Sequence, residues 1–248
     1  NLIDFDFDFD INIITRKTMT TKYIFGDIHD KIKDIEDNTI NLIYTSPPYG
    51  ITKAKWDMPL KWDILFKEMW RVLKPNGIIV LHASMPFSYE LLKYETPKYN
   101  YTWIKNFHTC PFLCKIQPLR KHEEVFVYYK KKGTYNPQMI GNNFHQKRNV
   151  VIGGQHKYYG NRKETKNIYT DEGGHTGRYP TTILEYPIRK DKTGITRTNE
   201  MMDYFIKTYS NENDTILDLT THNKYLGNRV KLLNRNFIGI DIIPFDIN

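Results

Sequence analysis

Hydrophobic residues recur along this chain with two different spacings. At helical spacing they form apolar faces within residues 62–73, 201–209 and 226–233, which predicts three amphipathic helices. Short runs of apolar, β-prone residues predict strands at 40–44, 78–81, 103–104, 125–129, 215–219 and 237–241. Because strands alternate with helices, we expect an α/β fold with a doubly wound, parallel sheet that carries helices on both faces.

Two parts of the chain lack these patterns. Residues 1–18 alternate Phe with Asp and have no turn signal that joins them to the rest, so they form either an added strand or an extension outside the fold, and we leave them out of the functional argument. From residue 130 the chain becomes rich in Gly and Asn and loses its periodicity. We therefore divide the fold into a first half at 19–129, an insertion at 130–192 and a second half at 193–248.

The size and composition restrict the class of protein. The 248 residues suffice for one large domain, or for one domain with a sizeable insertion. No apolar run approaches the ~20 residues that a membrane-spanning helix needs, so we expect a soluble protein without a membrane role. Cys110 and Cys114 are too few for a disulfide framework and no signal peptide is visible, which favours an intracellular site, cytoplasmic or nuclear. Their spacing is a weak zinc pattern, and we predict no metal.

The net charge of +8 is concentrated in residues 130–192. This segment holds 13 Lys or Arg against 5 Asp or Glu, so it accounts for the whole excess, and aromatic residues are interleaved with the cations. Phosphates attract cations and bases stack on aromatic rings, so this composition favours contact with nucleic acid. A flexible, solvated insertion is the alternative that charge alone leaves open.

A distinctive motif stands at the end of the strand predicted at 40–44, where residues 45–50 read Thr-Ser-Pro-Pro-Tyr-Gly. Two consecutive prolines fix φ and remove two N–H donors, which leaves carbonyl oxygens beside a hydroxyl and an aromatic ring. Such an edge suits the exocyclic amino group of a base: the Pro47 carbonyl and the Ser46 side chain accept its N–H donors while Tyr49 stacks on the ring. The motif alone would also fit an ordinary proline-stiffened turn.

This motif resembles the catalytic segment of the DNA methyltransferases that modify amino nitrogens, N4 of cytosine or N6 of adenine. Further stretches, at 26–27, 70–77, 118–129, 214–218 and 236–241, are similar to other blocks of that family, and the resemblance runs from about residue 23 to 243. The order, with the catalytic segment first and the cofactor loop last, is similar to that of the permuted β group. The resemblance implies a Rossmann-like methyltransferase sheet, S-adenosylmethionine as cofactor and double-stranded DNA as partner, as in restriction-modification systems.

The resemblance also implies how the chemistry proceeds. A flipped base would take the methyl group directly, without a covalent enzyme intermediate, which requires positioning and hydrogen-bond acceptors. The catalytic residues would be Ser46, Pro47, Pro48 and Tyr49. Serine at the first position is more usual among the N4-cytosine members, so we expect N4 of cytosine rather than N6 of adenine.

Ligand contacts follow from the same resemblance. Asp241 would bind the ribose hydroxyls, Asp27 would lie near the adenine and Asp218 near the methionine end of the cofactor. The complete predicted set of cofactor residues is Asp27, Asp218, Thr220, Asn223, Gly227 and Asp241. The basic insertion would be the target-recognition region, and its predicted nucleic-acid contacts are Lys147, Arg148, Lys157, Arg162, Lys163 and Arg178.

Two cofactor elements depart from the family pattern. After Asp218 the family has a glycine-rich turn, whose glycines permit positive φ and close approach to the ligand, whereas residues 222–224 here read His-Asn-Lys. Residues 193–198 read Thr-Gly-Ile-Thr-Arg-Thr where the family often has His-Pro-Thr-Gln-Lys-Pro. We favour an enzyme with an unusual cofactor loop. A catalytically silent DNA-binding subunit with an active partner chain, and an RNA methyltransferase, are the alternatives, and a homodimer is left open.

Overall fold

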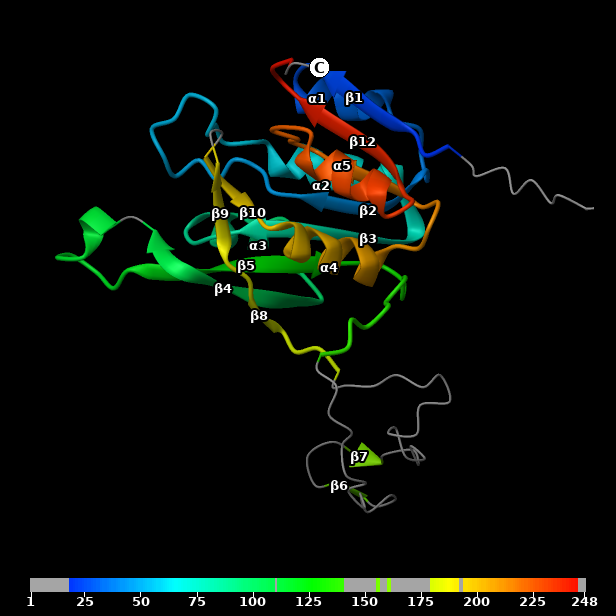
Figure 1. The fold of residues 1–248 in the computed structure, drawn as a ribbon. Coiled ribbons are helices and arrows are strands. Elements are labelled where there is room, and N and C mark those ends of the chain that lie inside the picture. Colours follow the sequence, from blue (N-terminus) through cyan, green and yellow to red (C-terminus); the bar gives the residue numbers. More distant parts are fainter. Residues whose placement is uncertain are drawn as a thin grey trace, which may run out of the picture.

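The computed structural model describes residues 18–109, 111–140, 155–156, 160–161, 179–191 and 194–244. Within these ranges eight strands form one sheet in the order β1-β12-β11-β2-β3-β5-β4-β8 (Figure 1). In chain order they are β1 (Thr21–Phe25), β2 (Ile40–Thr45), β3 (Leu73–Ala83), β4 (Tyr99–Thr109), β5 (Arg120–Tyr128), β8 (Ile183–Glu185), β11 (Thr215–Asp218) and β12 (Asn236–Asp241). Two small sheets pair β9 (Ile188–Asp191) with β10 (Gly194–Arg197), and β6 (Gln155–His156) with β7 (Gly160–Asn161).

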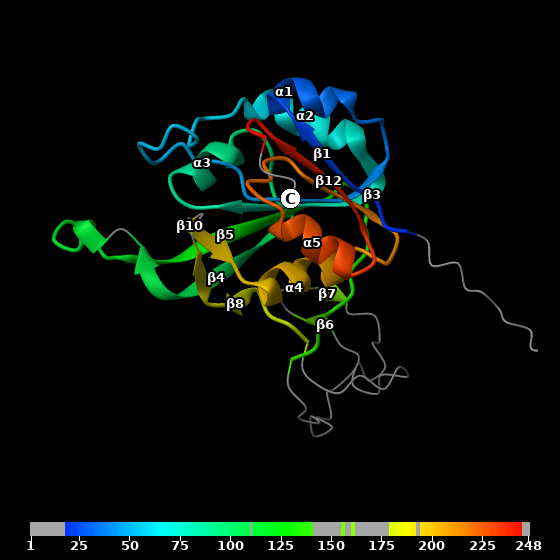
Figure 2. The same ribbon diagram turned by 45° about the horizontal axis from the view of Figure 1, so that its top comes forward.

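Helices cover both faces of the main sheet (Figure 2). One face carries α1 (Ile28–Lys31), the 3-10 turn η1 (Ile32–Asp34), α2 (Trp62–Val72) and α3 (Phe87–Leu92). The other carries α4 (Asn199–Tyr209) and α5 (Tyr225–Leu232). The three helices predicted from apolar spacing are thus confirmed as α2, α4 and α5. In the described ranges, none of the helices has the length and apolar character needed to cross a membrane.

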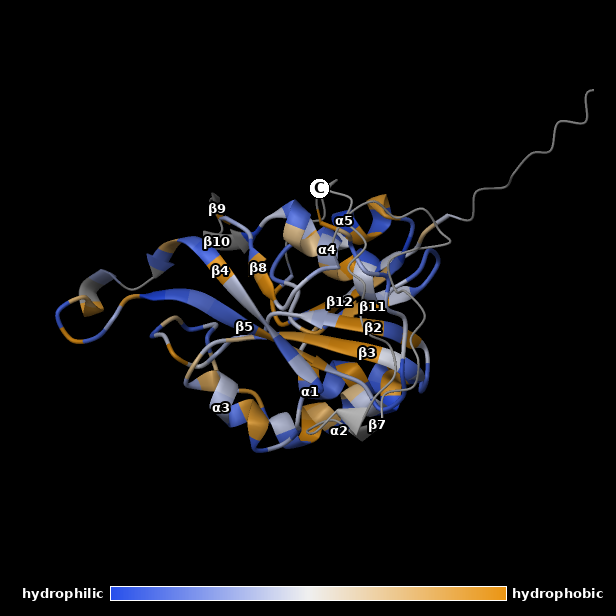
Figure 3. Ribbon diagram, turned by 90° about the horizontal axis from the view of Figure 1, so that it is seen from below, coloured by the Kyte–Doolittle hydropathy of each residue, from blue (hydrophilic) through white to orange (hydrophobic). Residues whose placement is uncertain are grey.

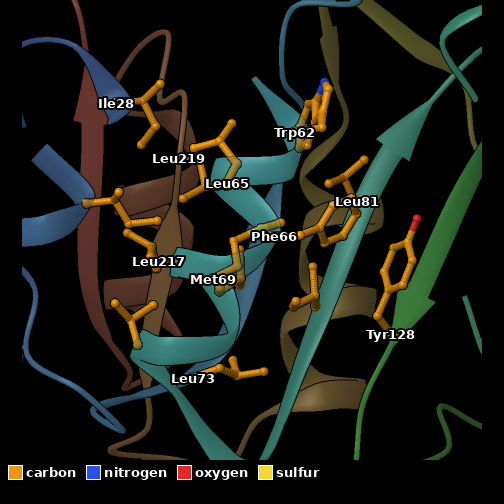
Figure 4. Close-up of a cluster of buried hydrophobic side chains, with 14 of the residues drawn as sticks. Ile28, Trp62, Leu65, Phe66, Met69, Leu73, Leu81, Tyr128, Leu217 and Leu219 are labelled. Carbon is orange, nitrogen blue, oxygen red and sulfur yellow. The ribbon is translucent and has the colours of Figure 1, made fainter. Parts of the chain in front are cut away.

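The apolar face of α2 shows how the sequence builds this core. Trp62, Leu65, Phe66 and Met69 are buried against the sheet and lie among residues of β3, β5 and β11 in Figure 4. Their spacing of three and four residues places them on one side of the helix. The strands differ in the same way. In Figure 3 the central β3 is largely apolar, whereas the outer parts of β4 and β5 are polar.

The main sheet confirms the doubly wound α/β fold, but it is mixed, so the expectation of a parallel sheet holds only for part of it. β1, β12, β11, β2 and β3 run parallel to one another, as predicted for a doubly wound sheet, but β5 runs antiparallel to both β3 and β4. The reason is the short connection between β4 and β5, residues 110–119, which includes the 3-10 turn η2 (Pro111–Leu113). A connection of this length joins neighbouring strands only when they are antiparallel.

The edge strand β8 lies within the segment assigned to the basic insertion. It pairs in parallel with β4, with Trp103 opposite Leu184, and Leu184 is buried in the core. The strand contains only three residues and lacks a long apolar run, so its sequence pattern is weak. The described end of the insertion therefore belongs to the main sheet, and the boundaries of a recognition region remain a prediction.

Gly227 is buried in α5, where the helix approaches β1 and β12. A Cβ atom at this position would lie 2.4 Å from the Tyr23 hydroxyl and 2.9 Å from the Phe237 ring. We expect Gly227→Ala to lower the free energy of unfolding by about 1–3 kcal/mol, because overpacking outweighs the gain in helix propensity. Denaturant unfolding would measure this. Asn228→Ala, at an exposed position of the same helix, is the control and should not destabilise the protein; equal stability of the Gly227 variant and the parent would contradict close packing.

Candidate active site

The carboxyl ends of four neighbouring parallel strands meet at one edge of the sheet. β1 ends before Asp27, β12 ends at Asp241, β11 ends at Asp218 and β2 ends before Ser46. Backbone contacts hold these ends together: Gly26 N donates to the Asp241 carbonyl over 2.8 Å. Four residues predicted separately from the sequence therefore lie along one edge, where ligands bind in open α/β sheets.

The predicted catalytic motif leaves β2 as a loop, and hydrogen bonds hold the far end of this loop in place. Pro47 is buried, while Ser46 and Tyr49 are partly exposed. Just beyond them, the buried Asp57 carboxylate accepts hydrogen bonds from three successive backbone N–H groups, those of residues 50, 51 and 52, over 2.7, 2.9 and 2.7 Å. Burial alone would raise the pKa of Asp57, but these bonds and one from the Thr52 side chain lower it. The loop that follows the motif is thereby closed on a charged group.

Tyr49 is held on its ring and at its hydroxyl. The ring stacks on Phe87 of α3, with 5.1 Å between centroids and 16° between planes. The hydroxyl donates to Glu123 Oε2 over 3.2 Å and accepts from Arg197 Nη2 over 3.4 Å. Burial raises the pKa of Tyr49 far above its usual value, and the Glu123 carboxylate raises it further. Tyr49 is therefore a neutral phenol throughout the physiological pH range.

Glu123, Arg197 and Lys105 are site residues that the sequence reasoning missed. They come from β5, β10 and β4, and nothing in their local sequence links them to Tyr49. Glu123 and Glu124 are adjacent on β5, so their side chains face opposite sides of the sheet. The structure confirms the separation, since Glu124 accepts instead from Ser88 Oγ over 2.9 Å.

Asp218 connects the end of β2 with the loop that follows β11. Its Oδ1 atom accepts from Thr45 Oγ1 over 2.8 Å and from Thr220 N over 3.2 Å. Burial raises the pKa of Asp218 to about 6, although both hydrogen bonds and the Arg197 charge act in the opposite direction. The carboxyl group is thus partly protonated near neutral pH.

The altered loop after β11 forms a closed turn without any residue in the left-handed region. Thr221 N donates to the Ile240 carbonyl over 2.8 Å, and Thr221 Oγ1 donates to the Asn223 carbonyl over 3.0 Å. Asn223 Oδ1 then accepts from Tyr225 N over 2.9 Å and closes the entry into α5. Side-chain hydrogen bonds therefore hold this turn, in which no residue adopts the positive φ that glycine permits.

The two remaining carboxylates lie at the ends of β12 and β1. Asp241 is half-buried, which raises its pKa, while the nearby His222 lowers it, and its Oδ1 accepts from Ile243 N over 2.8 Å. Asp27 caps α1 by accepting from His29 N over 2.8 Å, and that bond, with one from the His29 ring, lowers its pKa. Each carboxylate is fixed by a backbone donor shortly after it in the chain.

The other predicted site residues are placed less directly. Thr220 lies in the loop beside Asp218, with its hydroxyl 3.3 Å from that of Thr45. Gly227 lies inside α5, where its lack of a side chain serves helix packing, and its cofactor role remains a prediction. The six predicted nucleic-acid contacts lie outside the described residues: Lys147, Arg148, Lys157, Arg162, Lys163 and Arg178.

The raised pKa of Asp218 makes stability depend on pH. Because the folded pKa, about 6, exceeds the unfolded value, folding favours the protonated carboxyl; the cost of ionising it develops as pH rises through this interval. We expect Asp218→Asn, which still accepts from Thr45, to have a free energy of unfolding higher than the parent's by up to about 3 kcal/mol at pH 8. The variant should lose this advantage near pH 4.

Asp57→Asn is the matched control with the opposite sign. Its carboxylate has a lowered pKa, so this variant should be less stable than the parent at pH 8, and the difference should shrink as the pH falls through the acid range. Thermal unfolding across pH distinguishes the two. A stability difference between Asp218→Asn and the parent that stays the same from pH 4 to pH 8 would contradict a buried, titrating carboxyl group at this position.

Comparison with known proteins identifies similar chains. The Type II methyltransferase M.HpaI of Haemophilus parainfluenzae is 26% identical over 244 residues, which cover 90% of this chain and 71% of the relative. M.BglII of Bacillus subtilis is 41% identical over 69 residues, 25% of this chain and 19% of the relative. Among solved structures, the cytosine-N4-specific PvuII DNA methyltransferase matches with a TM-score of 0.62 and 13% identity over 92% of this chain and 83% of its own.

Another solved structure, the M1.HpyAVI–SAM complex, matches with a TM-score of 0.56 and 20% identity, covering 91% of this chain and 95% of that chain. At such identities these structures show the fold. The family itself is shown by the sequence, because the model of the N6/N4 DNA methylases matches residues 40–247. This chain therefore belongs to the N6/N4 DNA methylase family.

Proposed function

We propose that this protein is a site-specific DNA methyltransferase that moves a methyl group from S-adenosylmethionine to the exocyclic amino nitrogen of a flipped base. The supporting observation is the edge of the sheet at which the Ser46–Tyr49 segment lies beside the strand ends that carry Asp218, Asp241 and Asp27. An amino-group site and a set of carboxylates suited to a nucleoside are thereby adjacent. Membership of the DNA methylase family supports the same activity.

The motif residues suit an amine substrate. The Pro47 carbonyl and the Ser46 hydroxyl accept the two N–H groups, which keeps the nitrogen lone pair directed at the incoming methyl group. Tyr49 stacks on the flipped base through its ring, whose hydroxyl stays protonated. Serine is a neutral acceptor that also donates to a ring nitrogen, and we therefore propose N4 of cytosine as the preferred target over N6 of adenine.

The residues around the strand ends fit S-adenosylmethionine. Asp241, half-buried and oriented by Ile243 N, would accept the ribose hydroxyls; Asp27, held at the N-terminus of α1, would lie toward the adenine. Asp218 with Thr220 would face the methionine end, and the turn around Asn223 would border it. When bound, the cofactor supplies an electrophilic methyl group on a sulfonium centre. Two proteins of similar fold, M1.HpyAVI and the Thermus thermophilus protein TTHA0409, have been solved in complex with S-adenosylmethionine.

DNA binding by the basic insertion is the second part of the proposal. The excess positive charge lies in residues 130–192. Binding of such a segment to duplex DNA is favoured because it releases counterions from the phosphates. The six cations named above are the proposed contacts. A specific observation also keeps the silent DNA-binding subunit as an alternative, namely the sequence His-Asn-Lys at 222–224 in place of glycines.

Methyl transfer tests the catalytic segment. The protein should transfer labelled methyl from S-adenosylmethionine to duplex DNA, and Tyr49→Ala should reduce turnover strongly, since stacking worth ~1–3 kcal/mol is lost. Tyr94→Ala, which removes an exposed tyrosine after α3, is the control and should retain the parent rate. Digestion of the product to nucleosides should give N4-methylcytosine; N6-methyladenine alone would overturn the base choice and leave the reaction intact.

Cofactor binding tests the altered loop. Calorimetry should detect S-adenosylmethionine binding, and Asp241→Ala should weaken it by roughly one to two orders of magnitude, because hydrogen bonds of a carboxylate to the ribose are worth about 1.5–3 kcal/mol. Asp63→Ala, on the exposed side of α2, should bind as the parent does. A protein that binds DNA but shows no binding at millimolar S-adenosylmethionine would be the silent subunit.

A further inference from the structure

A cluster of charged side chains surrounds the Tyr49 hydroxyl behind the catalytic motif. Glu123 Oε2 accepts from that hydroxyl over 3.2 Å and lies 3.7 Å from Arg197 Nη2, while Glu123 Oε1 accepts from Lys105 Nζ over 2.5 Å. One carboxylate therefore ties together two cations and the phenol. These four side chains come from β5, β10, β4 and the loop after β2.

Burying the charges of this cluster costs free energy. The Lys105 side chain is only 3% exposed, Glu123 15% and Arg197 21%. Removing such charges from water carries a desolvation penalty that pairing repays only in part, and apolar residues of similar volume usually serve stability as well or better. Stability alone therefore gives no reason for this arrangement next to Tyr49.

The cations are also fixed on an aromatic platform. Lys105 Nζ lies 5.6 Å and Arg197 Cζ 5.7 Å from the centroid of the Trp103 ring. Trp103 is buried and stands directly opposite Glu123 in the pairing of β4 with β5. Glu123 and Lys105 thus take their positions from two paired strands of the main sheet, and Arg197 takes its position from the end of β10.

Tyr49 itself lies in a loop. Its backbone follows two prolines, and Phe87 stacks against one face of the ring, but a stacked ring still slides and turns in its plane. Hydrogen bonds at the hydroxyl, the atom farthest from the backbone, remove that freedom. Fixing a reacting partner in advance lowers the barrier of a step that depends on geometry.

We propose that Glu123, held by Lys105 and Arg197, is a positioning residue that fixes the Tyr49 ring in the orientation in which it stacks on the target base. This inference rests on the proposed function of Tyr49. It also assigns a role to Arg197, which lies in the stretch that departs from the family pattern: the arginine joins the second half of the chain to the catalytic loop.

A double-mutant cycle tests the proposal. Tyr49→Phe keeps the ring and removes the hydroxyl, and Glu123→Gln keeps the shape and removes the charge. Each should lower kcat for methyl transfer by roughly tenfold, while the double variant should be no slower than either one. Binding of S-adenosylmethionine should stay at the parent level in all three. Glu124→Gln, the neighbouring residue on the opposite side of β5, is the matched control and should keep the parent rate.

A spectroscopic measurement separates positioning from general damage. DNA with 2-aminopurine at the target position reports stacking through quenching of its fluorescence, and both single variants should give a brighter complex than the parent. If Glu123→Gln does not fold, Arg197→Gln takes its place in the cycle. Effects of the two substitutions that multiply, or a Tyr49→Phe variant with parent turnover and parent quenching, would overturn the positioning role. Lack of methyl transfer by the unaltered protein would instead contradict the proposed function.

Discussion

The parallel pairing of β2 with β11 brings the two central segments of the candidate site together. Ile216 stands opposite Leu42 and Leu217 opposite Ile43, so the strand that leads into the catalytic motif and the strand that leads into the altered loop end side by side. The hydrogen bond from Thr45 to Asp218 then joins the two ends directly. If this register moved by one residue, every side chain of one strand would exchange faces, and the motif would lose its neighbours.

The loop after β11 differs in sequence from the glycine-rich turn of the family pattern. Glycines in such a turn allow backbone conformations that other residues avoid; residues 222–224 here are His-Asn-Lys, and the backbone still forms a closed turn. Thr221 and Asn223 supply hydrogen bonds from their side chains to nearby backbone groups, and these bonds stabilise a turn that stays within the ordinary region of φ. The cost is bulk at the edge of the site, since three side chains occupy the stretch at 222–224.

Local patterns predicted the central elements well. The helices α2, α4 and α5 follow from apolar residues spaced by three and four, and β2, β11 and β12 follow from short buried runs, so the edge that carries Ser46, Asp218 and Asp241 could be located in advance. The strands β4 and β5 were underestimated, because their outer residues are polar on both sides (Figure 3) and resemble loop sequence. The antiparallel direction of β5 was also not predicted, because the direction of a strand depends on the length of the connection before it rather than on its amino-acid composition.

The environment of Tyr49 shows what sequence patterns do not contain. Lys105, Glu123 and Arg197 are separated by 18 and 74 residues along the chain, and they meet only because β4 pairs with β5 and β10 folds over Trp103. A charged residue in a strand is usually taken as solvent-exposed, and its burial becomes visible only with the tertiary contacts. Site residues whose partners are distant in the chain are therefore identified only from the structure, whereas a rigid motif such as two consecutive prolines can be recognised in the sequence.

The position of β2 between β3 and β11 also affects how the protein is made. β3 follows β2 closely, but β11 starts at Thr215, so one edge of β2 has no partner until residue 215 has left the ribosome. Pairings between residues so far apart close large loops and slow the completion of a sheet. During synthesis the apolar β2 therefore presents an open edge of the kind that promotes association between chains. The site forms only when β11 and β12 are added, which couples the gain of chemistry to a late step of folding.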